Sequence, residues 1–85
     1  MAISYSERSV VDAGALSECA PGTDLALMTL GGSSQLVSRL YALGLIPGVR
    51  IQVIRNGNPI VIRIGETRLC LRKEDAAAIR VQTVH

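Results

Sequence analysis

The chain has 85 residues, of which 48% are hydrophobic and 2% aromatic, and its formal net charge is +2 at pH 7. This length accommodates one domain with an aliphatic core, and so small a domain gains stability from a partner or from self-association. The weak positive charge does not indicate a dedicated nucleic-acid-binding protein, and no apolar run approaches the roughly 20 residues that span a bilayer. Residues 1–11 also lack the pattern of a signal peptide, so we expect a cytoplasmic protein that does not insert into the membrane.

The first part of the chain, residues 1–15, is rich in Ser and other small residues. This composition is typical of a mobile N-terminal arm, although Val10 and Val11 offer an alternative in which they pair with a sheet edge. The compact domain is expected to cover residues 16–85.

Residues 23–30 form the first predicted strand, which follows a single turn of chain ended by Pro21-Gly22. Side chains on a strand alternate between its two faces. The alternation predicts that Leu25, Leu27 and Thr29 share one face.

A helix is predicted next, with Ser33 or Ser34 as its N-cap and its end near Leu43. Gly44 follows at the position where a helix C-terminus favours a residue that adopts a left-handed conformation. The Gly-Gly-Ser-Ser segment before the helix lacks the Lys of a phosphate-binding P-loop. We interpret it as a turn and a helix cap.

The second half of the chain is predicted to form short strands joined by tight turns. Asn56-Gly57 is typical of a type I′ hairpin, and one helical turn is expected at residues 73–78. The predicted fold is mainly β: a small, closed, five-stranded antiparallel barrel with a helix between strands one and two. The four later strands are expected at residues 49–55, 60–64, 68–72 and 79–83.

The expected core consists of aliphatic side chains on the inward positions of these elements. It contains Leu25, Leu27, Leu36, Leu40, Leu43, Val49, Ile51, Val53, Ile60, Ile62, Ile64, Leu69, Leu71, Ile79 and Val81.

The sequence contains no recognisable pattern of metal ligands or of catalytic groups. Cys19, Cys70 and His85 have no C-x-x-C or H-x-x-x-H spacing, which predicts no specific metal site and leaves only incidental binding of soft transition metals. The two thiols are expected to be reduced in the cytoplasm. The carboxylate pair Glu74-Asp75 is interpreted as solvated or as interacting with the positive N-terminal end of the helical turn, and no nucleophile and base lie near each other in sequence. We therefore expect a non-enzymatic protein without a cofactor.

Five arginines occupy outward positions near or on the predicted strands. We interpret them first as a surface that keeps an aliphatic barrel soluble and blunts its edges. Docking to an acidic protein surface is a second interpretation, and nucleic acid binding is a third, disfavoured because the strands carry no aromatic residue on which a base stacks. The arginines are Arg50, Arg63, Arg68, Arg72 and Arg80.

The end of the predicted helix and the loop after it offer an apolar surface. Leu45 and Ile46 cannot both face inward in a tight loop, so one of them is expected to stay exposed beside Tyr41. Such a residue either covers the open end of the barrel or contacts a partner. Arg39 adjoins them along the helix, and the candidate partner-binding residues are Arg39, Tyr41, Leu45 and Ile46.

Four segments occur in an order that is characteristic of one protein family. The most specific is Leu40-Tyr41-Ala42-Leu43-Gly44-Leu45-Ile46-Pro47-Gly48, which is close to L-x-x-L-G-[LI]-x-P-G. The others lie at residues 16–22, 58–60 and 69–76. Together they resemble the FeoA family, small cytoplasmic accessory proteins of bacterial ferrous iron uptake.

This resemblance implies an SH3-like barrel and a role beside FeoB, the membrane iron permease that carries a cytoplasmic G-protein domain. The implied function is that of a non-enzymatic adaptor that binds the FeoB-type permease, is recruited by it to the inner face of the cell membrane, and modulates transport. Two functions of other classes stay open at this point: a nucleic-acid-binding module and a metal-sensing module.

Overall fold

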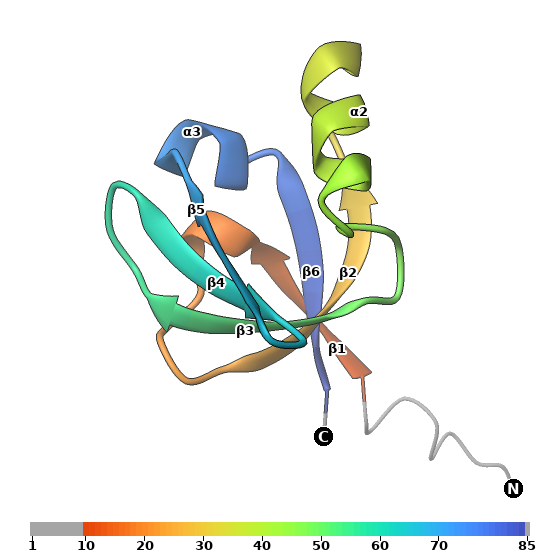
Figure 1. Cartoon of the computed structure of the whole chain (residues 1–85). Helices are drawn as coiled ribbons and strands as arrows, with labels where there is room; N and C mark the ends of the chain where they lie inside the picture. The colour runs from red at the N-terminus through yellow and green to blue at the C-terminus, as the bar shows by residue number, and fades with distance from the viewer. Residues whose placement is uncertain (1–9, 85) are drawn as a thin grey trace, which may run out of the picture.

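Six antiparallel strands form one sheet, in the order β1-β6-β2-β3-β4-β5, which curls around an aliphatic core (Figure 1). A computed structural model describes residues 10–84 of the chain, with side chains from Ala13 onward. The strands are β1 (Val10–Ala15), β2 (Asp24–Leu30), β3 (Arg50–Arg55), β4 (Ile60–Ile64), β5 (Thr67–Leu71) and β6 (Ile79–Val84). The helices are the 3₁₀ turn η1 (Leu16–Glu18), α2 (Ser34–Ala42) and α3 (Lys73–Ala76). None of these helices is long and apolar enough to cross a membrane.

The expectation of a closed, five-stranded barrel is wrong in two respects. A sixth strand, β1, pairs with β6, and within residues 10–84 no ladder joins the two end strands β1 and β5, so the sheet is open. β1 occupies the later part of the segment expected to be a mobile arm, and Val10 and Val11 pair with β6, as the alternative interpretation held. The rest of that arm, residues 1–9, lies outside the described residues.

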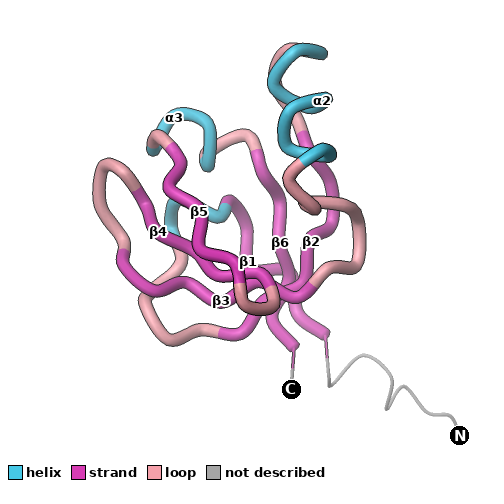
Figure 2. Tube along the Cα trace, viewed as in Figure 1, coloured by secondary structure: helices cyan, strands magenta, loops and turns pink. Residues whose placement is uncertain are grey.

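Helix α2 projects from the end of β2 beyond the sheet (Figure 2). The Ser33 hydroxyl accepts a hydrogen bond from the backbone N–H of Leu36 at 3.1 Å, which confirms the predicted N-cap. Gly44 has a φ of 99°, which confirms its left-handed conformation. The two backbone hydrogen bonds of a Schellman motif close the helix: Gly44 N–H to the Tyr41 carbonyl at 3.0 Å, and Leu45 N–H to the Leu40 carbonyl at 2.9 Å.

A β-bulge in β2 changes which side chains reach the core. The ladder with β6 shifts between Leu27 and Thr29, so two residues of β2 oppose one residue of the partner strand. Leu25 and Leu27 are buried as predicted. After the bulge, however, Thr29 is exposed and Leu30 packs partly against the core, so the predicted inward position of Thr29 is wrong.

The buried core agrees with the prediction on β3, β4, β6 and helix α2, and differs at the helix end. Leu43, expected inside, is 46% exposed, whereas Leu45 is 0% exposed. In a Schellman motif the second residue after the helix cap packs against the last helical turn, and here that residue is Leu45. The buried apolar side chains that sequence reasoning missed are Leu16, Cys19, Ala26, Leu45 and Ala76.

The loop after β3 does not form the type I′ hairpin that Asn56-Gly57 predicts. Such a turn needs positive φ at both central residues, and no described residue other than glycine has one. The Asn56 side chain instead donates hydrogen bonds to the backbone carbonyls of Ser17 and Cys19, at 3.2 and 2.7 Å. Asn56 therefore serves to hold the η1 segment against the sheet.

Candidate partner-binding surface

An exposed apolar surface lies at the C-terminal end of α2 and in the loop that follows. Tyr41, Leu43 and Ile46 are the large hydrophobic residues that the described part of the chain exposes, at 46%, 46% and 49%. All three lie within six consecutive residues, around the Schellman motif that turns the chain. We refer to Tyr41, Leu43 and Ile46 as the apolar patch.

Leu45 does not belong to this surface, which corrects the prediction that it contacts a partner. Its side chain is fully buried and forms part of the hydrophobic core. Only one of the two neighbouring residues of the loop faces inward, as expected, and Ile46 is the one that stays exposed. Leu43, which had been predicted to lie in the core, takes the place of Leu45 in the patch.

Arg39 lies next to the patch on α2, with 64% of its side chain exposed. Its guanidinium is 3.9 Å from a carboxylate oxygen of Asp75 in α3, and Asp75 is also 3.3 Å from Arg72. Ion pairs at exposed positions contribute about 0–1 kcal/mol. The contact therefore links α2 loosely to α3 and leaves Arg39 accessible to a partner.

The two cysteines are free, and they differ in surroundings. Cys19 is buried, with its sulfur 3.5 Å from the carbonyl oxygen of Ala15. Burial, and in second place the negative charge of Glu18, raises the pKa of the Cys19 thiol. Since the thiolate is the nucleophile and the metal ligand, Cys19 is suited to the core and poorly suited to either role. Cys70 is exposed on β5.

Within the described residues, no three side chains of His, Cys, Asp or Glu gather where they could hold a metal ion. The candidate ligands Cys19 and Cys70 lie in different environments, one in the core and one at the surface. The third candidate, His85, lies outside the described residues.

The five arginines do not form one continuous stripe. Arg72 is engaged by two carboxylates, at 3.5 Å from Glu74 and 3.3 Å from Asp75. The pair Glu74-Asp75, interpreted from the sequence as solvated, thus neutralises this end of the predicted stripe, although Asp75 itself is largely buried, with 12% of its side chain exposed. Arg50, Arg63 and Arg68 are exposed on three adjacent strands, β3, β4 and β5.

Three of the solved structures with the same fold carry the name FeoA. The crystal structure of an iron uptake regulatory protein, FeoA, has a TM-score of 0.77 and 31% identity over 88% of this chain and 99% of that chain. The FeoA protein from Chlorobium tepidum has a TM-score of 0.79 and 27% identity, over 84% of this chain and 70% of that chain. Zinc-complexed FeoA from Stenotrophomonas maltophilia has a TM-score of 0.70 and 26% identity, over 81% of this chain and 89% of that chain.

No curated protein matches the chain significantly in sequence. The family model of the FeoA domain, however, matches residues 15–83, which is most of the chain. The match includes helix α2, the Schellman motif, strands β2 to β5 and all but the last residue of β6. The chain belongs to the FeoA domain family, with the SH3-like fold of that family.

Proposed function

We propose that this protein is a non-enzymatic accessory protein of bacterial ferrous iron uptake, which binds the cytoplasmic part of a FeoB-type permease and modulates transport. Membership of the FeoA family supports this proposal. The Stenotrophomonas maltophilia relative was put forward as a bacterial ferrous iron transport activating factor. In this proposal the protein is cytoplasmic and reaches the inner face of the membrane by binding its partner.

The observation that supports the proposal most strongly is the apolar patch, which lies at the end of the projecting helix α2 and in the loop after it. Full burial of an aliphatic or aromatic side chain stabilises by about 1.5–3 kcal/mol. Because Tyr41, Leu43 and Ile46 are each about half exposed, covering the patch contributes about 2–4 kcal/mol to a complex. An aromatic residue beside an Arg is also the composition of a typical binding hot spot, and Arg39 supplies the Arg.

The test is a double substitution, Tyr41→Ala with Ile46→Asp, which removes two members of the patch and leaves the buried Leu45 in place. We expect it to weaken binding to the permease's cytoplasmic domain by at least about tenfold and to lower ferrous iron uptake in cells that lack the native copy. Both substituted residues are exposed, so the circular dichroism spectrum and melting temperature should stay close to those of the parent.

The matched control is Gln35→Ala with Ser38→Asp, which makes the same kind of change at two exposed positions of helix α2 outside the apolar patch. This control should bind the permease domain and support uptake like the parent. Parental uptake by the folded Tyr41→Ala, Ile46→Asp variant would show that the apolar patch is not the contact. Equal loss in the control would show that any change to α2 disturbs binding.

A further inference from the structure

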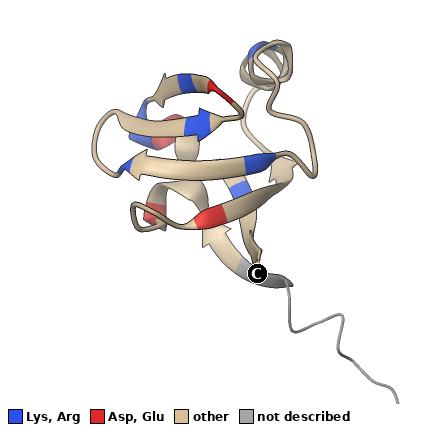
Figure 3. Ribbon diagram, turned by 60° about the horizontal axis from the view of Figure 1, so that its bottom comes forward, with Lys and Arg blue, Asp and Glu red and all other residues tan. Residues whose placement is uncertain are grey.

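Four side chains form one row across the outer face of strands β2 to β5. The register pairs Asp24 with Gln52, Gln52 with Arg63, and Arg63 with Arg68. Directly opposed residues of adjacent strands have Cβ atoms about 4.5–5.5 Å apart and point to the same face. From β2 to the edge strand β5, the row therefore reads acidic, neutral, basic, basic. Figure 3 shows basic residues, in blue, on neighbouring strands of the sheet.

The positive end of the row is not compensated. Arg63 and Arg68 oppose each other as like charges, an arrangement that destabilises a sheet. Among the described residues, the ion pairs within 4.0 Å involve Arg39 and Arg72, and none involves Arg50, Arg63 or Arg68.

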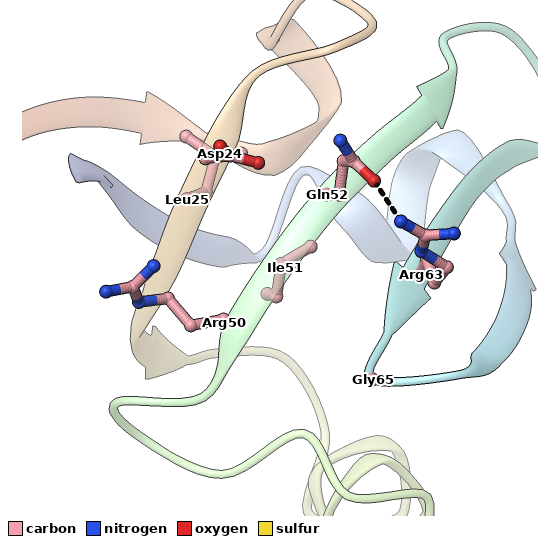
Figure 4. A pocket seen from close by; sticks show the side chains of 7 residues that line it. All are labelled: Asp24, Leu25, Arg50, Ile51, Gln52, Arg63 and Gly65. Carbon is pink, nitrogen blue, oxygen red and sulfur yellow. Dashed lines mark hydrogen bonds between the residues drawn. The ribbon is translucent and has the colours of Figure 1, made fainter. Parts of the chain in front are cut away.

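Gln52 keeps Asp24 away from Arg63. Its side chain lies between the two in Figure 4, and its carbonyl oxygen accepts a hydrogen bond from Arg63 at 2.9 Å. These residues line a shallow hollow of about 220 Å³ on the sheet surface, so the Arg63 guanidinium is open to a ligand. Among the side chains that the structure describes, the fold therefore leaves the repulsion between Arg63 and Arg68 without a neutralising carboxylate. Such a surface is suited to binding an anionic partner.

The strand that carries Arg68 is also an open edge. In the part of the chain that the structure describes, β5 pairs with β4 alone, and its ladder runs over five residue pairs without a bulge. Among the described residues the sheet order places no strand on the far side of β5, and the side chains of Thr67, Arg68 and Cys70 are exposed. Leu69 is half-buried, and Leu71, at the end of the strand, is buried. Bulges, proline and charged side chains are common means of blocking an edge strand, and among these β5 has only the charge of Arg68.

We propose that an extended, acidic protein segment adds to the sheet along β5 and places a carboxylate against Arg68 and Arg63. A strand added about 4.8 Å beyond β5 continues the row, so its residue opposite Arg68 points to the same outer face. The residue opposite Leu69 points to the other face and covers its exposed part. The segment that fits therefore alternates acidic and apolar residues.

A nucleic acid fits this surface less well. The row ends in the carboxylate of Asp24, and Glu66 lies in the turn between β4 and β5, so the positive region is short. Strands β3 to β5 contain no aromatic side chain on which a base stacks. The surface is separate from the apolar patch, and the proposal does not depend on the proposed function.

The experiment measures fluorescence anisotropy of a labelled peptide in which Glu alternates with Val. Two control peptides carry Gln in place of Glu, or the Glu sequence with alternate backbone nitrogens methylated. The protein should bind the Glu peptide about fivefold or more tightly than the Gln peptide at low salt, and the difference should shrink as salt screens the charges. Methylation should abolish binding, because it removes the backbone donors that strand addition needs.

Arg68→Gln should remove the preference for the Glu peptide, whereas the matched control Arg55→Gln, an exposed arginine at the far end of β3, should keep it. Because Arg68→Gln relieves repulsion from Arg63, its melting temperature should equal or exceed that of the parent. The Tyr41→Ala, Ile46→Asp variant should bind the peptide normally, which separates this proposal from that of the permease contact.

Several results would overturn the proposal. One is equal affinity for the Glu and Gln peptides, and another is binding that survives backbone methylation. A labelled single-stranded oligonucleotide that binds more tightly than the Glu peptide, and loses affinity in Arg68→Gln, would assign the row to nucleic acid. Sedimentation showing a dimer that Arg68→Gln dissociates would assign the edge to a second copy of the chain.

Discussion

Leu45 and Ile46 are adjacent and chemically similar, and the structure predicts opposite effects when each is shortened to Ala. Leu45 is 0% exposed and lies in the core, whereas Ile46 is 49% exposed. Leu45→Ala loses the transfer free energy of the buried side chain and leaves a cavity in the core, which together amount to about 2–5 kcal/mol. Ile46→Ala removes surface that is already half solvated, so its effect should stay within about 0.5 kcal/mol.

The loss expected for Leu45→Ala is large compared with the total free energy of unfolding of so small a domain. At about 0.05–0.15 kcal/mol per residue, the 85 residues have a free energy of unfolding of about 4–13 kcal/mol. In domains of this size, each kcal/mol shifts the melting temperature by about 4–8 °C. Leu45→Ala should therefore lower the melting temperature by about 8 °C or more, the least that these ranges imply, and Ile46→Ala by only a few degrees.

The assay is urea and thermal unfolding of the two variants, followed by far-ultraviolet circular dichroism. The dependence of the free energy on urea should be the same in both, so that the midpoints report stability directly. If both variants lose similar stability, or if Leu45→Ala loses less than about 1 kcal/mol, the burial of Leu45 in the core after the Schellman motif is wrong. In that case the assignment of Ile46 to the apolar patch fails with it.

Three other experiments test the structural roles assigned to particular residues. Gly44→Val should destabilise by more than about 1 kcal/mol, because a β-branched residue resists the φ of 99°; unchanged urea unfolding would contradict this. Asn56→Ala should cost about 1–3 kcal/mol, because it leaves the carbonyls of Ser17 and Cys19 without their donor; a loss below about 0.5 kcal/mol would refute that role. Iodoacetamide should label Cys70 well before Cys19, whose burial raises its pKa, and mass spectrometry showing equal labelling would contradict the buried position.

Local patterns in the sequence were enough to predict much of the fold. The alternation of β3 and β4, the Ser33 cap and the left-handed Gly44 depend on neighbouring residues alone, and all four agree with the structure. The sequence at the helix end also carries a local signal that distinguishes Leu45 from the exposed residues of the apolar patch. An apolar residue directly after a C-terminal Gly is the position that packs back on the helix, which would have assigned Leu45 to the core.

Other features depend on contacts between segments distant in sequence. β1 is short and rich in small residues, so its own pattern is weak, and it becomes a strand because β6 offers it a partner. The bulge in β2 exchanges Thr29 for Leu30 on the inner face, a shift that appears only when the opposing strand is known. Asn56 departs from hairpin geometry because its side-chain amide donates hydrogen bonds to the carbonyls of Ser17 in η1 and of Cys19 directly after it.

The candidate surfaces divide in the same way. Residue types and their local spacing were enough to assign the family, the aliphatic core and the outward direction of the arginines. The folded structure was needed to show that Leu43 replaces Leu45 at the surface and that Arg63 faces Arg68 beside an open edge. Strand register, bulges and edges are properties of pairs of strands, so no single segment of the sequence carries that information.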